Sequence, residues 1–302
     1  MQKNSDIRIE TANTDEKYKR LRALWCEVFG DLEAYVDAFY KNFEGEIEGY
    51  VALDESGEAL SALTCYKAGT FEGKDVYVSY AVCTREDSRS KGLAAALCTH
   101  VRDKVIAEGG LSIVSPAEAS LEEYYDKLGY KPFFYTSEKA ALSPDFDSEE
   151  YIEEDEYDLD IGDPGQGSFA PKFEMEQTSS DIYNRYRESF LAETPHIELS
   201  DAMLRMVAAE SENGEGLYVI NRGDAICSLA ESGAGRVVLT ELIVNPLLRE
   251  FSYDIDIEIA SLIAKHFAAV ETLYCTPGMG RCQSMIAGDA EAGPAYFGFP
   301  ID

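Results

Sequence analysis

The sequence predicts an α/β (α+β) protein with two domains, and three observations carry this prediction. The chain has 302 residues, which favours two domains at roughly 100 to 200 residues each. Short apolar strands alternate with segments of helical periodicity in both halves. Between the halves, eleven of the nineteen residues of Asp145–Asp163 are acidic, and prolines and glycines follow. We therefore expect a first domain at 1–143, a solvated acidic linker at 144–175 and a second domain at 176–302.

The first domain is expected to begin with a strand, two helices and three further strands. Ile7–Ala12 alternates as a strand does, and apolar residues recur at helical spacing from Leu21 to Phe29. A second short helix follows near Leu32–Phe43. The three strands lie at 50–53, 59–68 and 76–84. Only short turns separate these strands, which predicts antiparallel pairing.

A strand, a turn and a helix are expected next. The apolar positions 93, 97, 101 and 105 repeat every four residues and form the buried face of a helix. A strand at Leu111–Ser115 and a short helix near Leu121–Leu128 complete the order. Gly129 follows that helix, which is the usual place for a terminating glycine.

The turn before the long helix has the properties of an anion-binding site. The first turn of a helix leaves backbone N–H groups unpaired, and these donors and the helix dipole suit a pyrophosphate. Gly92 and Ala94 leave room for phosphate oxygens near the backbone, and Arg89 and Lys91 add positive charge. An isolated pattern of this kind is equally well an ordinary helix cap.

Two motifs make residues 7–142 resemble the GCN5-related N-acetyltransferase (GNAT) superfamily. The first reads Arg89-Ser-Lys-Gly92-Leu-Ala94 and is similar to the Arg/Gln-x-x-Gly-x-Gly/Ala that the family carries at the acyl-CoA pyrophosphate. The second reads Tyr125-Asp-Lys-Leu-Gly129-Tyr130 and is similar to the family's Tyr-x-x-x-Gly-Phe/Tyr ending. The chain also resembles tandem bacterial acetyltransferases of the enhanced-intracellular-survival type, some of which carry a Ser/Ala-Glu before the tyrosine, as Ala117-Glu118 does here.

The resemblance implies two GNAT-like domains, each with a mixed, mostly antiparallel sheet flanked by helices. It implies acetyl-CoA as co-substrate, with the pantetheine arm lying where the sheet of the first domain splays at its fourth strand. The residues implied to bind acetyl-CoA are Val82, Cys83, Thr84, Arg89, Ser90, Lys91, Gly92, Leu93, Ala94 and Ala95.

The resemblance also implies a catalytic tyrosine. In acyl transfer an amine attacks a thioester, and a phenol near the sulfur can protonate the departing thiolate. The family's tyrosine matches Tyr125, and the neighbouring Tyr124 is the competing candidate. Both could instead be packing residues of a short helix.

Glu118 departs from the family pattern. Many members have an asparagine seven residues before the tyrosine, where this chain has Glu118. A carboxylate there could contact a cationic acceptor, so Glu118 and Tyr124 are candidate substrate-binding residues. The alternative is that Glu118 is a helix N-terminal carboxylate favoured by the dipole.

The second half repeats the order of helix, helix, three strands, helix and strand. The helices are expected at 182–191, 199–209 and 255–267, and the strands at 217–220, 225–230, 237–244 and 272–276. Asn245-Pro246-Leu247-Leu248-Arg249-Glu250 replaces the phosphate turn. We expect a degenerate GNAT-like domain that binds no acyl-CoA.

Composition narrows the function classes. The chain has 57 acidic and 26 basic side chains, a formal net charge of −31, which argues against nucleic-acid or membrane-surface partners. No apolar run is long enough for a signal peptide or a membrane span. Seven cysteines without a CxxC pair, and three scattered histidines, predict a reduced cytoplasmic protein without a metal site.

The sequence therefore predicts an acetyltransferase that moves the acetyl group of acetyl-CoA by direct attack of an amine. The acceptor is expected to be a small, cationic amine or a peptide terminus. A non-catalytic acyl-CoA sensor and a transferase for another acyl group remain alternatives. The apolar run 295–301 is expected to be ordered, with the carboxylates of Asp302 docked or, less favoured, reaching the active site. The sequence does not indicate an oligomeric state.

Overall fold

The computed structural model describes residues 7–145, 173–213, 215–233 and 235–299. Most of the predicted linker and the terminal Asp302 lie outside these residues. The chain forms two compact units. The first unit comprises Met1–Ser137, Leu191–Glu210 and Pro277–Asp302, and the second unit comprises Glu138–Phe190 and Ser211–Thr276.

The sheet of the first unit is mixed and mostly antiparallel, as the sequence predicts. Its strands run in the order β1 (Arg8–Thr11), β2 (Ile47–Leu53), β3 (Ala59–Phe71), β4 (Lys74–Thr84), β5 (Leu111–Val114), β13 (Arg281–Ala287) and β6 (Lys131–Leu142). The predicted antiparallel pairing of β2, β3 and β4 is confirmed. Among the neighbouring strands just named, β4 and β5 pair in parallel and the others pair antiparallel.

The helices of the first unit cover both faces of this sheet. They are α1 (Asp15–Phe29), α2 (Glu33–Asn42), α3 (Leu93–Ala107) and α4 (Glu122–Lys127), with short 3-10 turns η1 (Glu86–Ser88) and η2 (Ala119–Leu121). Tyr80 packs edge-on against Trp25 of α1, whereas Tyr77 packs with the apolar face of α3. Tyr77 and Tyr80 are three residues apart on β4, so their side chains point to opposite faces.

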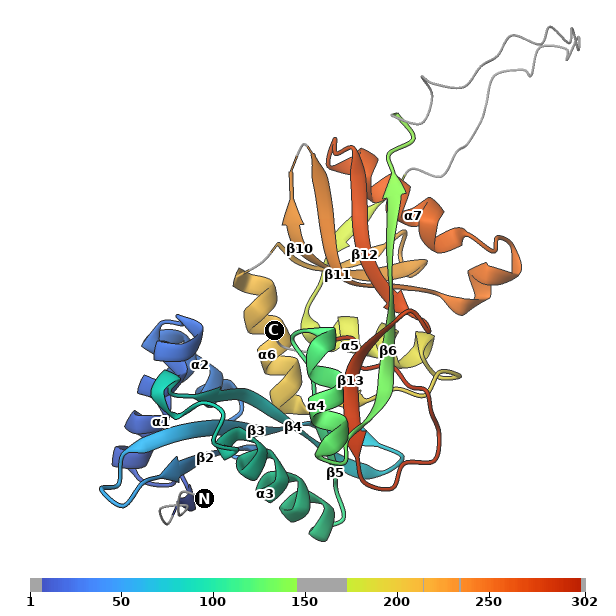
Figure 1. Cartoon of the computed structure of the whole chain (residues 1–302). Helices are drawn as coiled ribbons and strands as arrows, with labels where there is room; N and C mark the ends of the chain where they lie inside the picture. Colours follow the sequence, from blue (N-terminus) through green and yellow to red (C-terminus); the bar gives the residue numbers. More distant parts are fainter. Residues whose placement is uncertain (1–6, 146–172, 214, 234, 300–302) are drawn as a thin grey trace, which may run out of the picture. The chain divides into compact units, whose positions relative to one another are not determined.

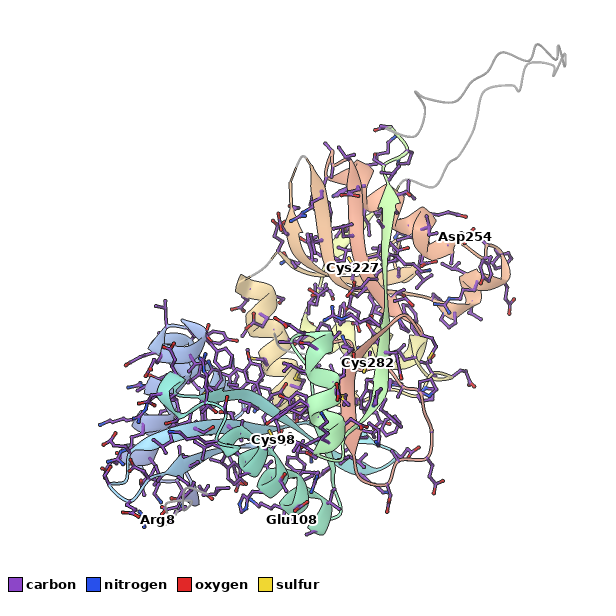
Figure 2. All side chains as sticks on the ribbon, in the orientation of Figure 1. Arg8, Cys98, Glu108, Cys227, Asp254 and Cys282 are labelled. Carbon is purple, nitrogen blue, oxygen red and sulfur yellow. The ribbon has the colours of Figure 1, made fainter. Side chains whose placement is uncertain are left out.

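The predicted apolar face of α3 is confirmed. Leu97 and Val101 are fully buried, and Leu93 and Val105 nearly so. Leu97, Val101 and Val105 pack with strand residues of β2 and β3 and with Cys98 of the same helix, which Figure 2 labels on α3. The four-residue repeat therefore orients α3 so that its N-terminal turn sits at the end of β4.

The end of the chain supplies a strand to the first unit. Figure 1 shows β13 between β5 and β6, with Ile286 opposite Ile113 of β5. In the run after β13, Ala295, Tyr296, Phe297 and Phe299 are buried. Strand β8 (Glu198–Leu199), which pairs with β3, and most of α6 (Asp201–Asn213) belong to this unit too. The compact units have bounds of their own, and the domain boundaries at 143 and 176 stay a prediction.

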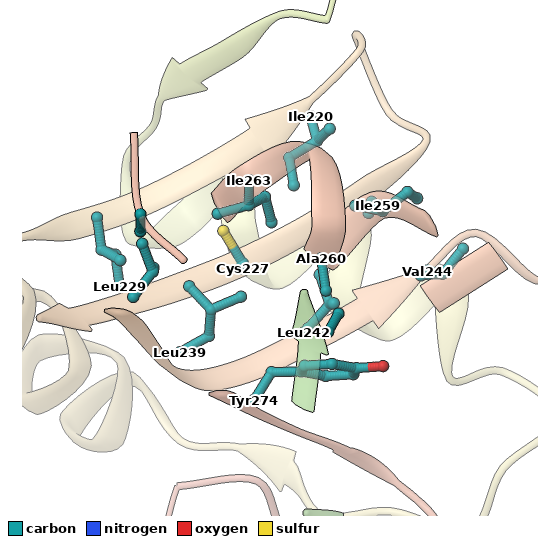
Figure 3. Close-up of a cluster of buried hydrophobic side chains, with 14 residues drawn as sticks. Ile220, Cys227, Leu229, Leu239, Leu242, Val244, Ile259, Ala260, Ile263 and Tyr274 are labelled. Carbon is teal, nitrogen blue, oxygen red and sulfur yellow. The ribbon is translucent and has the colours of Figure 1, made fainter. Parts of the chain in front are cut away.

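The second unit has its own sheet and core. The end of β6 is followed in order by β12 (Glu271–Pro277), β11 (Arg236–Val244), β10 (Ala225–Ser232), β9 (Gly216–Ile220) and β7 (Met175–Gln177). Its helices are α5 (Ser180–Phe190), α7 (Ile255–His266) and the 3-10 turn η3 (Pro246–Glu250). Figure 3 shows Ile259 and Ile263 of α7 packed with Cys227 and Leu239 of the sheet. Its GNAT-like ancestry stays a prediction.

Candidate functional site

The site of the first unit lies where β4 and β5 separate. The two strands pair only from Val76 with Leu111 to Ser79 with Val114. Beyond Ser79, β4 continues beside β3, with a register shift and a left-handed residue, Ala81, at φ 48°. Among the residues that the structure describes, one edge of β4 therefore has no strand partner over its last residues.

The backbone at this open edge belongs to Val82 and Thr84. The Arg85 N–H donates to Leu60 O at 3.0 Å, and Cys83 O accepts from Ser61 Oγ at 2.6 Å, so both residues face β3. Since backbone groups alternate along a strand, those of Val82 and Thr84 face the opening. Thr84 O accepts one hydrogen bond there, from Arg89 Nε at 3.3 Å.

The turn after β4 delivers the N-terminus of α3 to the same place. Ser90 and Gly92 adopt left-handed backbone angles, with φ of 61° and 78°. A side chain at Gly92 would meet no atom within 4 Å, so its glycine is required by backbone angle and the space above it is open. No acidic residue lies in the first turn of α3, and no side chain caps it. The backbone N–H groups of this turn, which have no acceptor within the helix, are therefore not capped by a side chain.

A cavity of about 390 Å³, here called the loop cavity, opens above this turn. It is lined by Val28, Phe29, Val82, Cys83, Thr84, Ser88, Arg89, Ser90, Gly92, Leu93, Ala94, Ala95 and Tyr124. Of the residues predicted to bind acetyl-CoA, all but Lys91 line it. The Lys91 ammonium is turned back to Asp87 O at 3.0 Å.

A second cavity, here called the splay cavity, also measures about 390 Å³. It is lined by Trp25, Phe29, Asp31, Val78, Ser79, Tyr80, Ala81, Val82, Ser115, Ala117, Leu121 and Tyr125. Phe29 and Val82 line both cavities. The two spaces therefore adjoin at the open edge of β4.

The two candidate tyrosines line different cavities. Tyr125 is 9% exposed and lines the splay cavity, whereas Tyr124 is half-buried and lines the loop cavity. Their ring centres are 5.1 Å apart. Burial raises the pKa of the Tyr124 phenol to about 12, and burial raises the pKa of Tyr125 further. Both phenols stay protonated at neutral pH, and Tyr125 is the one placed to face the splay.

The structure brings in an acidic residue that the sequence analysis did not single out. Gly30 ends α1 in the left-handed conformation, and Asp31 follows it directly. Trp25 Nε1 donates to Asp31 Oδ2 at 2.7 Å and fixes the carboxylate at the splay cavity. A helix-ending glycine before an aspartate is a signal for a turn, but sequence alone does not show which cavity it lines.

Glu118 is not among the residues that line the two cavities, although its neighbour Ala117 lines the splay cavity. It is exposed, and its carboxylate accepts a hydrogen bond from Ser120 Oγ at 3.1 Å. Its predicted role in acceptor binding stays a prediction that this geometry does not favour.

The corresponding turn of the second unit differs in charge. Helix α7 carries Asp256 and Glu258 in its first turn, where α3 has no acidic residue. Negative charge there opposes phosphate binding. The prediction that the second half binds no acyl-CoA agrees with this charge, though acyl-CoA binding itself is not tested by it.

Two general features concern the part of the chain that the structure describes. Within it, no three His, Cys, Asp or Glu side chains gather closely enough to hold a metal ion. None of its helices is long and apolar enough to cross a membrane.

Comparison with known proteins gives a family match for part of the first unit. Residues 15–130 match the sequence model of the acetyltransferase (GNAT) family, a stretch that includes both cavities' lining residues and both motifs. No curated protein matches the chain.

Solved structures resemble nearly the whole chain. A probable N-acyltransferase from Enterococcus faecalis superposes with a TM-score of 0.65 at 13% identity, covering 93% of this chain and 72% of that one. A GCN5-related N-acetyltransferase from Anabaena variabilis gives 0.64 at 12% identity, covering 92% and 72%. Eis1 from Mycobacterium abscessus gives 0.58 at 10% identity, covering 93% and 72%. At these identities the likeness concerns the fold.

Proposed function

Because residues 15–130 belong to the acetyltransferase (GNAT) family, whose members transfer acetyl groups from acetyl-CoA, we propose that the first unit acetylates the amine of a small cationic acceptor. One observation carries the proposal. The loop cavity, which suits a pyrophosphate, adjoins the splay cavity, which holds a buried neutral tyrosine and a fixed carboxylate.

Acetyl-CoA would occupy the loop cavity with its pyrophosphate on the N-terminal turn of α3. The turn offers free N–H donors, the positive end of the helix dipole and the exposed Arg89 guanidinium. The pantetheine amides would pair with the backbone of Val82 and Thr84 along the open edge of β4, as an added strand does. The thioester would then lie near Phe29 and Val82, where the cavities adjoin.

The acetyl group would move in one displacement without an acyl-enzyme. The amine nitrogen forms a bond to the thioester carbon, the carbon–sulfur bond breaks, and Tyr125 gives its phenolic proton to the thiolate. The nitrogen releases its extra proton to water, from which Tyr125 is reprotonated. The nearby thiols are poor nucleophiles, because burial raises the pKa of Cys83 and Cys98 to about 12.

The acceptor class follows from charge and shape. Asp31 is the acidic residue among those that line the splay cavity, and Trp25, Phe29 and Tyr80 supply aromatic surface. Carboxylates and aromatic faces both bind ammonium groups. A formal net charge of −31 also concentrates cations at the protein surface. We therefore infer an acceptor with a cationic group besides the attacking amine, or a peptide terminus of this charge.

The test is CoA release with a panel of linear diamines, amino alcohols, amino sugars and short peptides. The expected result is turnover with cationic amines, and a KM for them that rises in Asp31→Asn. If CoA is released faster from a longer acyl-CoA than from acetyl-CoA, the protein is a transferase for that other acyl group. Binding of acetyl-CoA without CoA release from any amine would favour the acyl-CoA sensor instead.

A further inference from the structure

A pair of serine hydroxyls joins the splay cavity to the strand supplied by the end of the chain. Ser115 follows β5, is half-buried and lines the cavity. Its Oγ lies 2.7 Å from Oγ of Ser284 on β13, and Ser284 is fully buried. The two serines are 169 positions apart in the sequence, so no local pattern predicts this contact.

The strand register holds the pair together. Met285 is the β-partner of Val114, which places the preceding Ser284 beside the following Ser115. Ser284 is inaccessible to water, and its hydroxyl lies within hydrogen-bonding distance of the Ser115 hydroxyl. A buried hydroxyl keeps such a partner because an unmade hydrogen bond is costly. Ser284 therefore fixes the rotamer of Ser115.

Ser115 has hydrogen-bonding capacity left over. A serine hydroxyl is one donor and two acceptors, so one bond to Ser284 leaves positions for a ligand. Among the other polar side chains that line the cavity, Asp31 is held by Trp25, the Tyr80 hydroxyl is bonded to Tyr35, and Tyr125 is the proposed acid. Ser79 lines the cavity as well, but it is buried, whereas Ser115 is half-buried and more open to a ligand.

We propose that Ser115 accepts a hydrogen bond from the attacking amine and that Ser284 positions it, an inference that rests on the proposed acetyl transfer. Ser115 follows β5 on the side of the splay opposite Val82, so it flanks the space assigned to the thioester. One N–H of the acceptor donates to Ser115 Oγ, which turns the nitrogen lone pair toward the thioester carbon. A primary amine has an N–H for this contact and a second one to lose, so the site selects primary over secondary amines.

The test compares Ser115→Ala, Ser284→Ala and the double variant. The amine is 1,4-diaminobutane, or the panel amine that the wild-type protein acetylates fastest. Loss of one neutral hydrogen bond predicts a KM for the amine raised roughly 2- to 12-fold in Ser115→Ala. Ser284→Ala should shift it in the same direction by less, and the double variant should equal Ser115→Ala, because Ser284 acts through Ser115.

Two measurements separate this role from a structural one. The Kd of acetyl-CoA, from calorimetry, should be unchanged in all three variants. Ser112→Ala is the matched control, since it removes a buried hydroxyl bond to Tyr130 (3.0 Å) from the same strand without lining either cavity. It should lower the melting temperature and leave the KM of the amine unchanged.

Several outcomes would overturn the inference. An unchanged KM in Ser115→Ala, additive effects in the double variant, or a weakened Kd for acetyl-CoA would each do so. A kcat/KM for a secondary amine equal to that for its primary analogue would also contradict the inference. Absence of CoA release by the wild-type protein with every amine is a different failure, because it removes the proposed function itself.

Discussion

A protein that stops after Thr276 should lose the first unit, although everything that matches the family lies before that point. The removed part includes β13, which separates β5 from β6, and the buried run after it. Without β13, β5 and β6 expose a row of unpaired backbone groups next to the splay. Binding of acetyl-CoA should therefore disappear together with cooperative unfolding of this unit.

The magnitude follows from burial. The removed segment holds five large apolar side chains that are 7% exposed or less, namely Met285, Ile286, Tyr296, Phe297 and Phe299. At about 1.5 to 3 kcal/mol for each buried side chain, their loss amounts to roughly 7 to 15 kcal/mol. This equals the whole stability of a typical domain, about 5 to 15 kcal/mol.

A graded version keeps the chain intact. Phe297 is fully buried in the first unit, and Phe251 is 84% exposed in the second. Phe297→Ala should lower the free energy of unfolding by about 3 to 5 kcal/mol. Phe251→Ala should change the free energy of unfolding by no more than about 0.5 kcal/mol. Urea unfolding followed by circular dichroism measures both. If residues 1–143 alone unfold cooperatively and bind acetyl-CoA like the full chain, the reasoning is refuted.

Three further predictions concern the site. Tyr125→Phe should lower kcat by a factor of roughly 10² to 10⁴, and the affinity for acetyl-CoA, measured by calorimetry, should be unchanged. If Tyr124→Phe shows this loss of kcat and Tyr125→Phe does not, Tyr124 is the general acid. Gly92→Glu should abolish acetyl-CoA binding, because it puts negative charge at the phosphate turn. Gly73→Glu carries the same backbone strain, at φ 72° with no atom near, and should only lower stability. Burial raises the pKa of Tyr125, so the phenol stays protonated to high pH. We therefore expect kcat/KM to rise with pH as the amine deprotonates, with no decline at any pH up to about 10. A decline in kcat/KM centred below that pH would contradict the assignment.

The sequence by itself determined the local elements of the first unit and the turn before α3. Helix α3 follows from a four-residue apolar repeat, and the turn at Gly92 follows from residues that are neighbours in the chain. The register of Tyr125 to Gly129 is equally local, and the N–H of Tyr130 donates to Tyr125 O at 3.1 Å to close that turn. Such features need no distant partner, so a pattern of a few residues predicts them.

Tertiary structure alone decided which residues share the site. Asp31 reaches the splay cavity because Gly30 ends α1 there, and Tyr124 and Tyr125 separate because adjacent residues of α4 face different cavities. The place of β13 between β5 and β6 depends on pairing between residues far apart in the chain. Strand pairing uses backbone groups that every residue carries and side chains that only need to be apolar on one face. The sequence of a short apolar strand therefore does not specify which strand it pairs with, and the pairing depends on the packing of the whole chain.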